Sequence, residues 1–299
     1  MLSLFNSQST RSHSSLTKNL PPLYWSYIPT PVSYLHALSL QHALVRHKID
    51  TKSIHNSPDF LLLLQHQPVY TTGRRTTNSV WLAEEMTRLA RANPGADFIS
   101  TLRGGQTTFH GPGQLVGYPI LDIGQMGLTT RDYVDRLLKV LGAVLVHPVL
   151  PIPIQTLDSR TDPNLPVGTF VGDVRKKIAS IGIQVRRRVT SHGFALNVEQ
   201  ACQAGFQHIL ACGLSNTRSI SIESALSELT TEKVTKPAPL RVSDMVRPTV
   251  EVFGNLFGRE MCEFKHTDQS LDPTTFRLLE ELNLSTQHSS ARALHSSRA

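Results

Sequence analysis

The sequence predicts an α/β domain of the α+β kind, built on a mixed β-sheet with helices. Short apolar segments bounded by turn-forming residues alternate with segments of helical periodicity, and one pair of neighbouring segments has the residue alternation of a β-hairpin. The chain has 299 residues, of which 39% are hydrophobic and 18% are charged. This is enough apolar material to build one large domain or two small ones.

The first elements expected after the N-terminal segment are a helix and a buried strand. Residues 31–48 carry apolar side chains such as Leu35 and Leu38 at helical spacing, which predicts a helix. Residues 60–64 are wholly apolar and lie between turn formers, which predicts a strand that is buried on both faces. We expect residues 71–75 to form a loop that carries two arginines.

The centre of the chain predicts two further strands and a capped helix. Residues 98–102 and 114–122 are the strand candidates, and a glycine-rich segment, residues 103–113, separates them. Thr129 and Asp132 have the spacing of a capping box, so we expect a helix to begin there.

The C-terminal half predicts a loop, a hairpin and a closing helix. Residues 148–166 contain five prolines and are expected to be a loop or an insertion. Apolar residues alternate over 177–185, a basic turn follows at 186–188, and residues 194–198 are apolar again, which predicts a β-hairpin. Residues 244–257 place apolar side chains on one helical face, which predicts the closing helix.

Both ends of the chain are expected to lie outside the main folded domain, which we place at residues 23–262. Residues 1–49 contain no Asp or Glu, and the N-terminal end is basic and rich in serine. This composition is typical of a mitochondrial transit peptide, predicted here over residues 1–22, with an ordinary disordered tail as the alternative. Residues 263–299 are expected to be a largely disordered tail, because residues 285–299 have almost nothing to bury.

Charge, hydropathy and cysteine content limit the class of protein. The formal net charge of +7 favours acidic partners, with the arginines at 74–75 and 186–188 as candidate contacts. Aromatic residues are not interleaved with the basic ones, so we expect no nucleic-acid partner. No apolar run approaches the roughly 20 residues that span a bilayer, so we expect no membrane span. Three cysteines without a C-x-x-C pair form neither a disulfide framework nor a four-cysteine zinc site, so we expect a reducing compartment and no metal.

Three regions carry residues suited to chemistry. Five glycines between Arg103 and Gly117 allow the backbone to approach a ligand closely, although a tight turn between strands explains them equally well. Cys212 has a neighbouring glycine that permits a sharp turn and access by a substrate carbonyl, with a buried inert thiol as the alternative. Lys177 begins an otherwise apolar strand, with an ordinary surface lysine as the alternative.

Taken together, four sequence blocks resemble the lipoyl(octanoyl) transferases, the lipoate-protein ligase B family. They occur in the family's order within roughly residues 35–257: RGGQTTFHGPGQLVGYPILD from Arg103, KIASIGIQV from Lys177, VTSHGFALNV from Val189 and ACGL from Ala211. The first block alone is about twenty residues long. Four blocks in the same order make the resemblance specific.

The resemblance has three departures. Ala211 stands where proline is usual before the cysteine, and Ser191 stands where tyrosine is common. Residues 148–166 are irregular where family members continue more regularly into a strand. The first two leave the chemistry intact, and the third concerns local architecture.

The resemblance implies a biotin/lipoate protein ligase-like fold, with a larger mixed sheet, helices and a smaller sheet. It implies that Cys212 takes the octanoyl group from octanoyl-acyl carrier protein as a thioester and that Lys177 assists. The acyl group then passes to a lysine of a lipoyl domain, in 2-oxoacid dehydrogenase E2 subunits or the glycine cleavage H protein, as the first step of protein lipoylation. No cofactor is implied. The acyl-binding positions implied by the resemblance are Arg103, Gly104, Gly105, Gln106, Thr107, Thr108, Phe109, His110, Ser180, Ile181, Gly182, Gly193, Phe194 and Ala195.

Elementary chemistry agrees with this mechanism. A thioester donor and a thioester intermediate have nearly equal free energies, so a thiol can take the acyl group without ATP. A cysteine with a pKa of about 8.5 is mostly protonated at neutral pH, and a lysine ammonium about 4 Å away would lower that pKa by up to about three. Once the acyl group neutralises the thiolate, Lys177 loses its counter-charge and can act as a base on the acceptor amine.

Two other function classes stay open at this point. An ATP-dependent lipoate or biotin ligase on the same fold would activate the free acid as an adenylate and would not need Cys212. A non-catalytic module that holds acyl carrier protein would not need Cys212 and Lys177 together. Exchange of pyrophosphate into ATP would identify the ligase.

Overall fold

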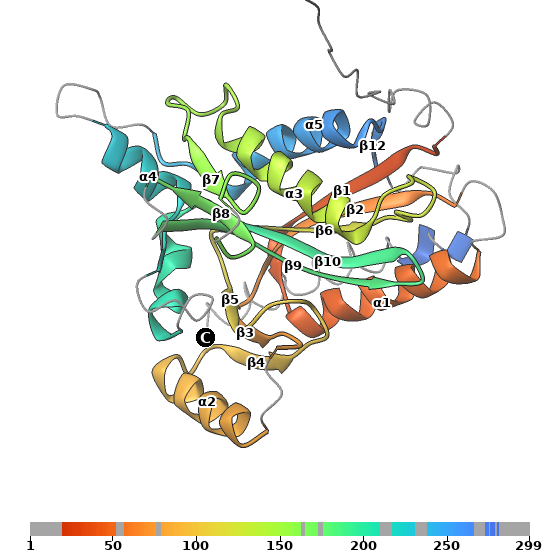
Figure 1. Ribbon diagram of the computed structural model, residues 1–299. Helices are drawn as coiled ribbons and strands as arrows, with labels where there is room; N and C mark the ends of the chain where they lie inside the picture. Colours follow the sequence, from red (N-terminus) through yellow and green to blue (C-terminus); the bar gives the residue numbers. More distant parts are fainter. Residues whose placement is uncertain are drawn as a thin grey trace, which may run out of the picture.

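The computed structural model describes residues 20–51, 57–75, 79–162, 165–172, 176–209, 217–230, 238–265, 273–274, 276–278 and 280. Over these residues the chain forms a nine-stranded mixed sheet and a separate three-stranded sheet, with helices packed against the large sheet (Figure 1). The structure thus has the predicted larger mixed sheet, smaller sheet and helices.

The large sheet combines a parallel edge with an antiparallel remainder. Strands β12, β1 and β2 run parallel, whereas each step from β2 through β6, β10, β9 and β8 to β7 is antiparallel, and the short β11 pairs in parallel with β9. In spatial order the strands are β12 (Met261–Glu263), β1 (Leu23–Val32), β2 (Asp59–His66), β6 (Gln114–Ile120), β10 (Val189–Asn197), β9 (Lys176–Arg186), β8 (Gly168–Val171) and β7 (Thr156–Asp158), with β11 (Arg218–Ser219) beside β9. The small sheet has the order β4 (Asp97–Ser100), β3 (Val69–Thr72), β5 (Thr108–His110).

Helices cover the large sheet on both faces (Figure 1). Helices α3 and α5 pack on one face, α1 packs on the other, and α2 lies beside the small sheet. The described helices are α1 (Tyr34–Asp50), α2 (Ser79–Ala92), α3 (Thr130–Leu145), α4 (Ile222–Leu229) and α5 (Val246–Phe257), with 3-10 helices η3 (Gln200–His208) and η5 (Val242–Met245).

Strand β2 shows how the two cores share one sheet. Leu61 and Leu63 belong to the core under α3 and α5, while Leu62 and Leu64 belong to the core under α1. Successive side chains of a strand point to opposite faces, so an uninterrupted apolar run supplies both cores at once. The prediction of a strand buried on both faces is confirmed.

Three other predicted elements are confirmed. Thr129 and Asp132 cap the start of α3 with both hydrogen bonds of a capping box. Strands β9 and β10 form the predicted hairpin, and its turn residues Arg187 and Arg188 have φ angles of 48° and 70°, as a tight two-residue hairpin turn requires. Helix α5 occupies most of the predicted range 244–257.

Strand β1 corrects the expected start of the fold. The predicted helix 31–48 begins only at Tyr34, because the preceding residues extend β1 to Val32. Pro29 and Pro31 argue against a strand in the sequence, since proline cannot donate to a β-ladder. They lie where the pairing with β2 shifts register, so the ladder is already irregular there.

Segments expected to be loops contain short strands. Part of the predicted loop 71–75 belongs to β3, and the glycine-rich segment 103–113 contains β5. The proline-rich segment 148–166 contains β7 and the buried side chains of Leu150 and Ile154. These strands are three or four residues long, which is too short to show an alternating pattern in the sequence.

The described structure reaches beyond residues 23–262 at both ends, and at the C-terminal end it corrects part of the expected disordered tail. Leu20 packs against the core under α3 and α5, whereas Phe264 is buried in the core under α1 and the helical residues Phe276 and Leu278 pack against that core. Residues 1–19 and 281–299, which hold most of the expected leader and much of the expected tail, lie outside the described residues.

Candidate active site

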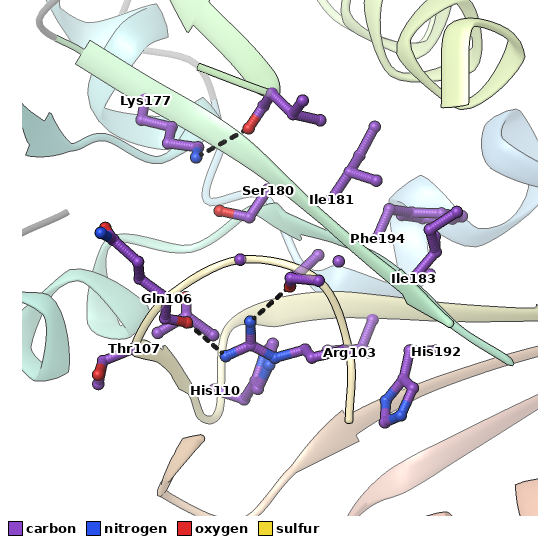
Figure 2. A pocket seen from close by; sticks show the side chains of 18 of the residues that line it. Arg103, Gln106, Thr107, His110, Lys177, Ser180, Ile181, Ile183, His192 and Phe194 are labelled. Atoms are coloured by element: carbon purple, nitrogen blue, oxygen red, sulfur yellow. Dashed lines mark hydrogen bonds between the residues drawn. The ribbon is translucent and has the colours of Figure 1, made fainter. Parts of the chain in front are cut away.

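A cavity of about 410 Å³ lies against strands β9 and β10 (Figure 2). Its other walls come from the loop 103–108, the loop 165–167 and residues of η3 and its C-terminal end. Cavities of roughly 300–1,000 Å³ are typical for small organic ligands. The cavity combines apolar side chains with several polar groups, as a substrate site does.

The structure brings almost all of the sequence-predicted site residues to this cavity. Phe109 does not line it, because its ring packs 5.1 Å from Tyr70 and 5.7 Å from Phe206, centroid to centroid. Cys212 lies outside the described residues, as do all of residues 210–216. The predicted residues that line the cavity are Arg103, Gly104, Gly105, Gln106, Thr107, Thr108, His110, Lys177, Ser180, Ile181, Gly182, Gly193, Phe194 and Ala195.

Small residues on the hairpin shape the cavity floor. Across the two strands Ser180 pairs with Ala195 and Gly182 pairs with Gly193. A Cβ atom on Gly182 would lie 3.0 Å from the Cδ of Arg103. The missing side chain therefore lets the loop that carries Arg103 lie close against β9.

Arg103 holds that loop in shape. The Nη2 of Arg103 donates to the main-chain oxygens of Thr71 at 2.7 Å and Gln106 at 2.9 Å, and its Nη1 donates to that of Gly104 at 3.1 Å. The main-chain nitrogen of Gly104 in turn donates to the carbonyl oxygen of Ile183 on β9 at 2.9 Å. Charged donors make strong hydrogen bonds, so this buried guanidinium stabilises the wall of the cavity.

Lys177 lies at the start of β9 beside the loop 165–167 (Figure 2). Its side chain is only 6% exposed. The Nζ donates to the main-chain oxygen of Val167 at 3.2 Å and lies 5.6 Å from the centroid of the Phe170 ring. The ammonium is thus held at the cavity by a carbonyl oxygen and an aromatic face.

Buried rings lie at the end of the cavity away from Lys177. The Nε2 of His66 is 2.6 Å from the hydroxyl of Tyr118, and the Nδ1 of His192 is 3.4 Å from the hydroxyl of Tyr34. None of these side chains is more than 8% exposed, and all of them except His66 line the cavity. We name as the ring cluster Tyr34, His66, His110, Tyr118 and His192.

Burial keeps the ring cluster uncharged. Desolvation lowers the pKa of His66 to about 4 and the pKa values of His110 and His192 to about 3. Desolvation also raises the pKa of Tyr34 to about 12. At neutral pH the histidines are therefore neutral imidazoles and the tyrosine keeps its proton.

A polar network joins the ring cluster to the strand beside Lys177. The Nδ1 of His110 is 2.7 Å from the Oε1 of Gln114, whose Nε2 donates to the Oδ1 of Asn197 at 2.8 Å. The Nδ2 of Asn197 donates to the Oγ of Ser219 at 2.9 Å. Strands β6, β10 and β11 are thereby cross-linked at the cavity.

The residues that line the cavity but were not predicted from the sequence include Tyr34, Tyr118, His192 and Asn197. His192 and Asn197 stand within the block VTSHGFALNV, and Tyr118 stands within the first block, so a signal was present for these three. For Tyr34 there was none, because it lies at the start of α1 outside all four blocks.

The two described cysteines do not line the cavity. Cys202 is 1% exposed, its Sγ donates to the main-chain oxygen of Glu199 at 3.1 Å, and burial raises its pKa to about 12. It is therefore a protonated thiol. Cys262 lies in β12, at an edge of the large sheet that three strands separate from the hairpin.

The candidate arginine contacts separate into two places. Arg75 lines the cavity and is exposed together with Arg74. The turn 186–188 instead lies at the far end of the hairpin from Lys177, and Arg188 donates to the main-chain oxygen of Leu128 at 2.9 Å. Of these arginines only Arg75 lines the cavity.

The described part of the chain has neither a metal-binding group nor a membrane-spanning helix. No group of three or more His, Cys, Asp or Glu side chains in it could hold a metal ion. No helix in it is long and apolar enough to cross a membrane.

The chain is similar to known octanoyltransferases. Residues 33–238 match the family model of the lipoyl protein ligase A/B catalytic domain. The mitochondrial octanoyltransferase LIP2 of Arabidopsis thaliana is 36% identical over 64% of this chain and 74% of its own length. The mitochondrial octanoyl-acyl-carrier-protein:protein N-octanoyltransferase LIPT2 of Danio rerio is 38% identical over 65% of this chain and 79% of its own length.

Solved structures share the fold. A bi-partite lipoate protein ligase from Thermoplasma acidophilum superposes with a TM-score of 0.54 at 14% identity, over 88% of this chain and 92% of that chain. The predicted biotin/lipoate protein ligase-like fold is thereby confirmed. The matched catalytic domain and the extent of these similarities show that the chain belongs to the lipoyl protein ligase A/B catalytic domain family, and within it to the octanoyltransferases of the lipoate-protein ligase B group, which are acyltransferases.

Proposed function

We propose that this protein transfers an octanoyl group from octanoyl-acyl carrier protein to a lysine of a lipoyl domain, through a thioester on Cys212. The observation that carries the proposal is the position of Lys177 at the cavity. Ile209 and Ser219, which lie on either side of the segment with Cys212, both line the same cavity. Cys212 follows Ile209 by three residues, and three residues of extended chain span about 11 Å at most.

The first half-reaction is acyl transfer to sulfur. The ammonium of Lys177 favours the thiolate of Cys212, and the thiolate attacks the carbonyl carbon of the octanoyl thioester. The carbon–sulfur bond to the carrier breaks, and the carrier's thiol leaves with a proton. Because one thioester replaces another, this step needs no ATP.

The second half-reaction is acyl transfer to nitrogen. With the sulfur acylated, the ammonium of Lys177 has lost its counter-charge and can release a proton. The neutral amine then accepts a proton from the acceptor lysine as that lysine attacks the thioester. The products are an amide on the lipoyl domain and the free thiol of Cys212.

The cavity suits an unbranched acyl chain. Val116, Ala195, Phe206 and Ile209 supply apolar lining of the cavity. A chain attached near Lys177 would bury its methylenes along this lining, and burial of each methylene contributes about 0.8 kcal/mol. Binding here would need no cofactor.

Partners and location follow from the same proposal. Arg74 and Arg75 are exposed, and Arg75 lines the cavity, so this pair would contact an acidic carrier protein, because exposed cations increase association rates. The acceptors would be lipoyl domains of 2-oxoacid dehydrogenase E2 subunits and the glycine cleavage H protein. The acid-free residues 1–49 and the mitochondrial names of two relatives support a mitochondrial location.

The experiment is a transfer assay with octanoyl-acyl carrier protein, a lipoyl domain and no ATP. We expect the purified protein to octanoylate the lipoyl domain, Cys212→Ala to be inactive, and the matched controls Cys202→Ala and Cys262→Ala to stay active. Transfer that occurs only when ATP and free octanoate are supplied would replace the proposal with an ATP-dependent ligase.

A further inference from the structure

His192 has a backbone conformation that is unusual for its place in the fold. It lies within β10 and pairs with Ile183 of β9, yet its φ is 54°, in the left-handed region. A residue with a side chain rarely adopts this conformation, and such strain is concentrated at functional sites. The side chain amide of Gln41 on α1 accepts a hydrogen bond from the main-chain nitrogen of His192 at 2.8 Å, which holds the backbone there.

The unusual backbone places the imidazole at the cavity. His192 lines it together with Tyr34 and Tyr118, and Figure 2 shows His192 and Lys177 at opposite ends of the labelled part of the hairpin. The Cα partner of His192 on β9 is Ile183, six residues along the strand from Lys177. The side chain is thus remote from the reacting end of any acyl group held beside Lys177.

The ring residues that line the cavity at His192 are buried, whereas the lining near Lys177 includes an exposed residue. The side chains of His192, Tyr34 and Tyr118 are no more than 3% exposed. Near Lys177, by contrast, Val167 is 43% exposed. An acyl chain that enters past Lys177 therefore extends toward a wall of buried rings.

The chemistry of that wall suits the methyl end of an acyl chain. Its imidazoles are neutral, because burial lowers the pKa of His192 to about 3, so these rings place no charge of their own against an apolar chain. Hydrogen bonds hold the rings of this wall in place. The hydroxyl of Tyr34 is 3.4 Å from the Nδ1 of His192, and the hydroxyl of Tyr118 is 2.6 Å from the Nε2 of His66. Packed rings cannot move aside without losing these contacts.

We propose that His192, supported by Tyr34 and Tyr118, forms the end wall that limits the length of the acyl chain. This inference rests on the proposed function and adds the residue that determines its chain-length specificity. A rigid wall at fixed distance from Lys177 admits a chain up to one length and excludes additional methylenes. The strained backbone of His192 directs its imidazole toward the end of the acyl chain.

The test uses substitutions that enlarge the cavity without adding backbone strain. His192→Gly removes the ring, and glycine is the residue best suited to a φ of 54°. His192→Asn is a smaller change that keeps a polar side chain tolerated in the left-handed region. The matched control is Arg187→Gly, which relieves a φ of 48° in the hairpin turn at a residue that does not line the cavity.

Chain-length preference is measured in two ways on the full chain. The first is kcat/KM for transfer from carriers loaded with acyl chains of eight, ten and twelve carbons. The second is the Kd of the protein for free octanoate and free dodecanoate, which requires no transfer. Circular dichroism and thermal unfolding establish that each variant is folded.

We expect His192→Gly to raise the twelve-carbon to eight-carbon ratio at least tenfold in both measurements, since one methylene in a hydrophobic pocket changes specificity by about 10-fold to 200-fold. His192→Asn should shift the ratio in the same direction by less, and Arg187→Gly should leave it unchanged. A folded His192→Gly with the wild-type ratio in both measurements would overturn the inference. A shifted Kd ratio in a protein that transfers no acyl group would support the end wall and refute the proposed function alone.

Discussion

The ammonium of Lys177 donates to the main-chain oxygen of Val167 at 3.2 Å, and this contact depends on the glycine that follows Val167. A Cβ atom on Gly168 would lie 2.4 Å from the Cε of Lys177, so any side chain there would displace the lysine. The lysine stem fills the space that Gly168 leaves empty. Loop 165–167 and the start of β9 therefore position the lysine together.

Lys177→Ala is expected to fold and to lose transfer. Without the ammonium, the Cys212 thiol would return toward its ordinary pKa of about 8.5, and the acceptor amine would lack a base. We expect kcat/KM to fall by about 10² to 10⁴, as is typical when an acid–base group is removed. Lys177→Arg is the matched variant: it keeps the positive charge but cannot lose a proton, so acylation should survive better than transfer to the lipoyl domain. Equal loss of both half-reactions in Lys177→Arg would refute the base role.

Gly193→Ala is expected to destabilise the protein. Its Cβ would lie 2.2 Å from the main-chain oxygen of Gly117 on the neighbouring strand, and backbone atoms cannot move aside cheaply. Overpacking of this kind costs about 1–3 kcal/mol of unfolding free energy, measurable by urea denaturation. Gly95→Ala is the control, because nothing lies within 4 Å of the added atom. Equal stability of the two variants would show that β6 and β10 tolerate a wider separation.

Asp59→Asn is expected to destabilise the fold far from the cavity. The Oδ1 of Asp59 lies 2.7 Å from the Nζ of Lys48, and its Oδ2 accepts from Arg259, with all three side chains buried. These cations lower the pKa of Asp59 despite its burial. Loss of the carboxylate leaves buried charges uncompensated, at a cost of about 3–5 kcal/mol. Glu85→Gln, which weakens an ion pair with the exposed Arg88, should cost under about 1 kcal/mol by the same denaturation assay.

Stability is expected to fall as the pH falls below about 6.5. The folded-state pKa values of His66, His110 and His192 are depressed to about 4, 3 and 3, so between pH 6.5 and about 4 the unfolded chain binds protons there that the folded chain does not. Each such histidine contributes a slope of about 1.4 kcal/mol per pH unit. Denaturation at pH 5 and 6 should therefore show a slope about 1.4 kcal/mol per pH unit smaller in His192→Asn than in the wild type. An unchanged slope would mean that His192 is charged in the folded protein.

The sequence predicts the elements whose signals are local. Three elements have a signal that is contained within a few residues. An apolar run predicts the buried strand at 60–64, a cap spacing predicts the helix start at Thr129, and an alternation of residues predicts the hairpin 177–198. Strand β1 does not, because Pro29 and Pro31 contradict a strand when read alone. Their compatibility with the sheet depends on a register shift against β2, which is a tertiary property.

The candidate site was predictable where the motifs are continuous in sequence. Residues 103–108 and 180–182 lie at the cavity as expected, but the ring cluster assembles from α1, β2, β5, β6 and β10. No sequence window contains those rings together, and Tyr34 and His192 are 158 positions apart. Phe109, which shares its block with cavity residues, faces away because neighbouring residues of β5 point to opposite sides.

The most direct test of the proposed mechanism is the intact mass of the protein after incubation with octanoyl-acyl carrier protein in the absence of ATP. The account predicts one added octanoyl group, removed by neutral hydroxylamine as a thioester is, absent from Cys212→Ala and present in Cys202→Ala and Cys262→Ala. The buried, protonated thiol of Cys202 and the position of Cys262 on β12 make both poor acceptors. An octanoyl adduct that persists in Cys212→Ala, or one that forms only with ATP, would contradict the thioester mechanism.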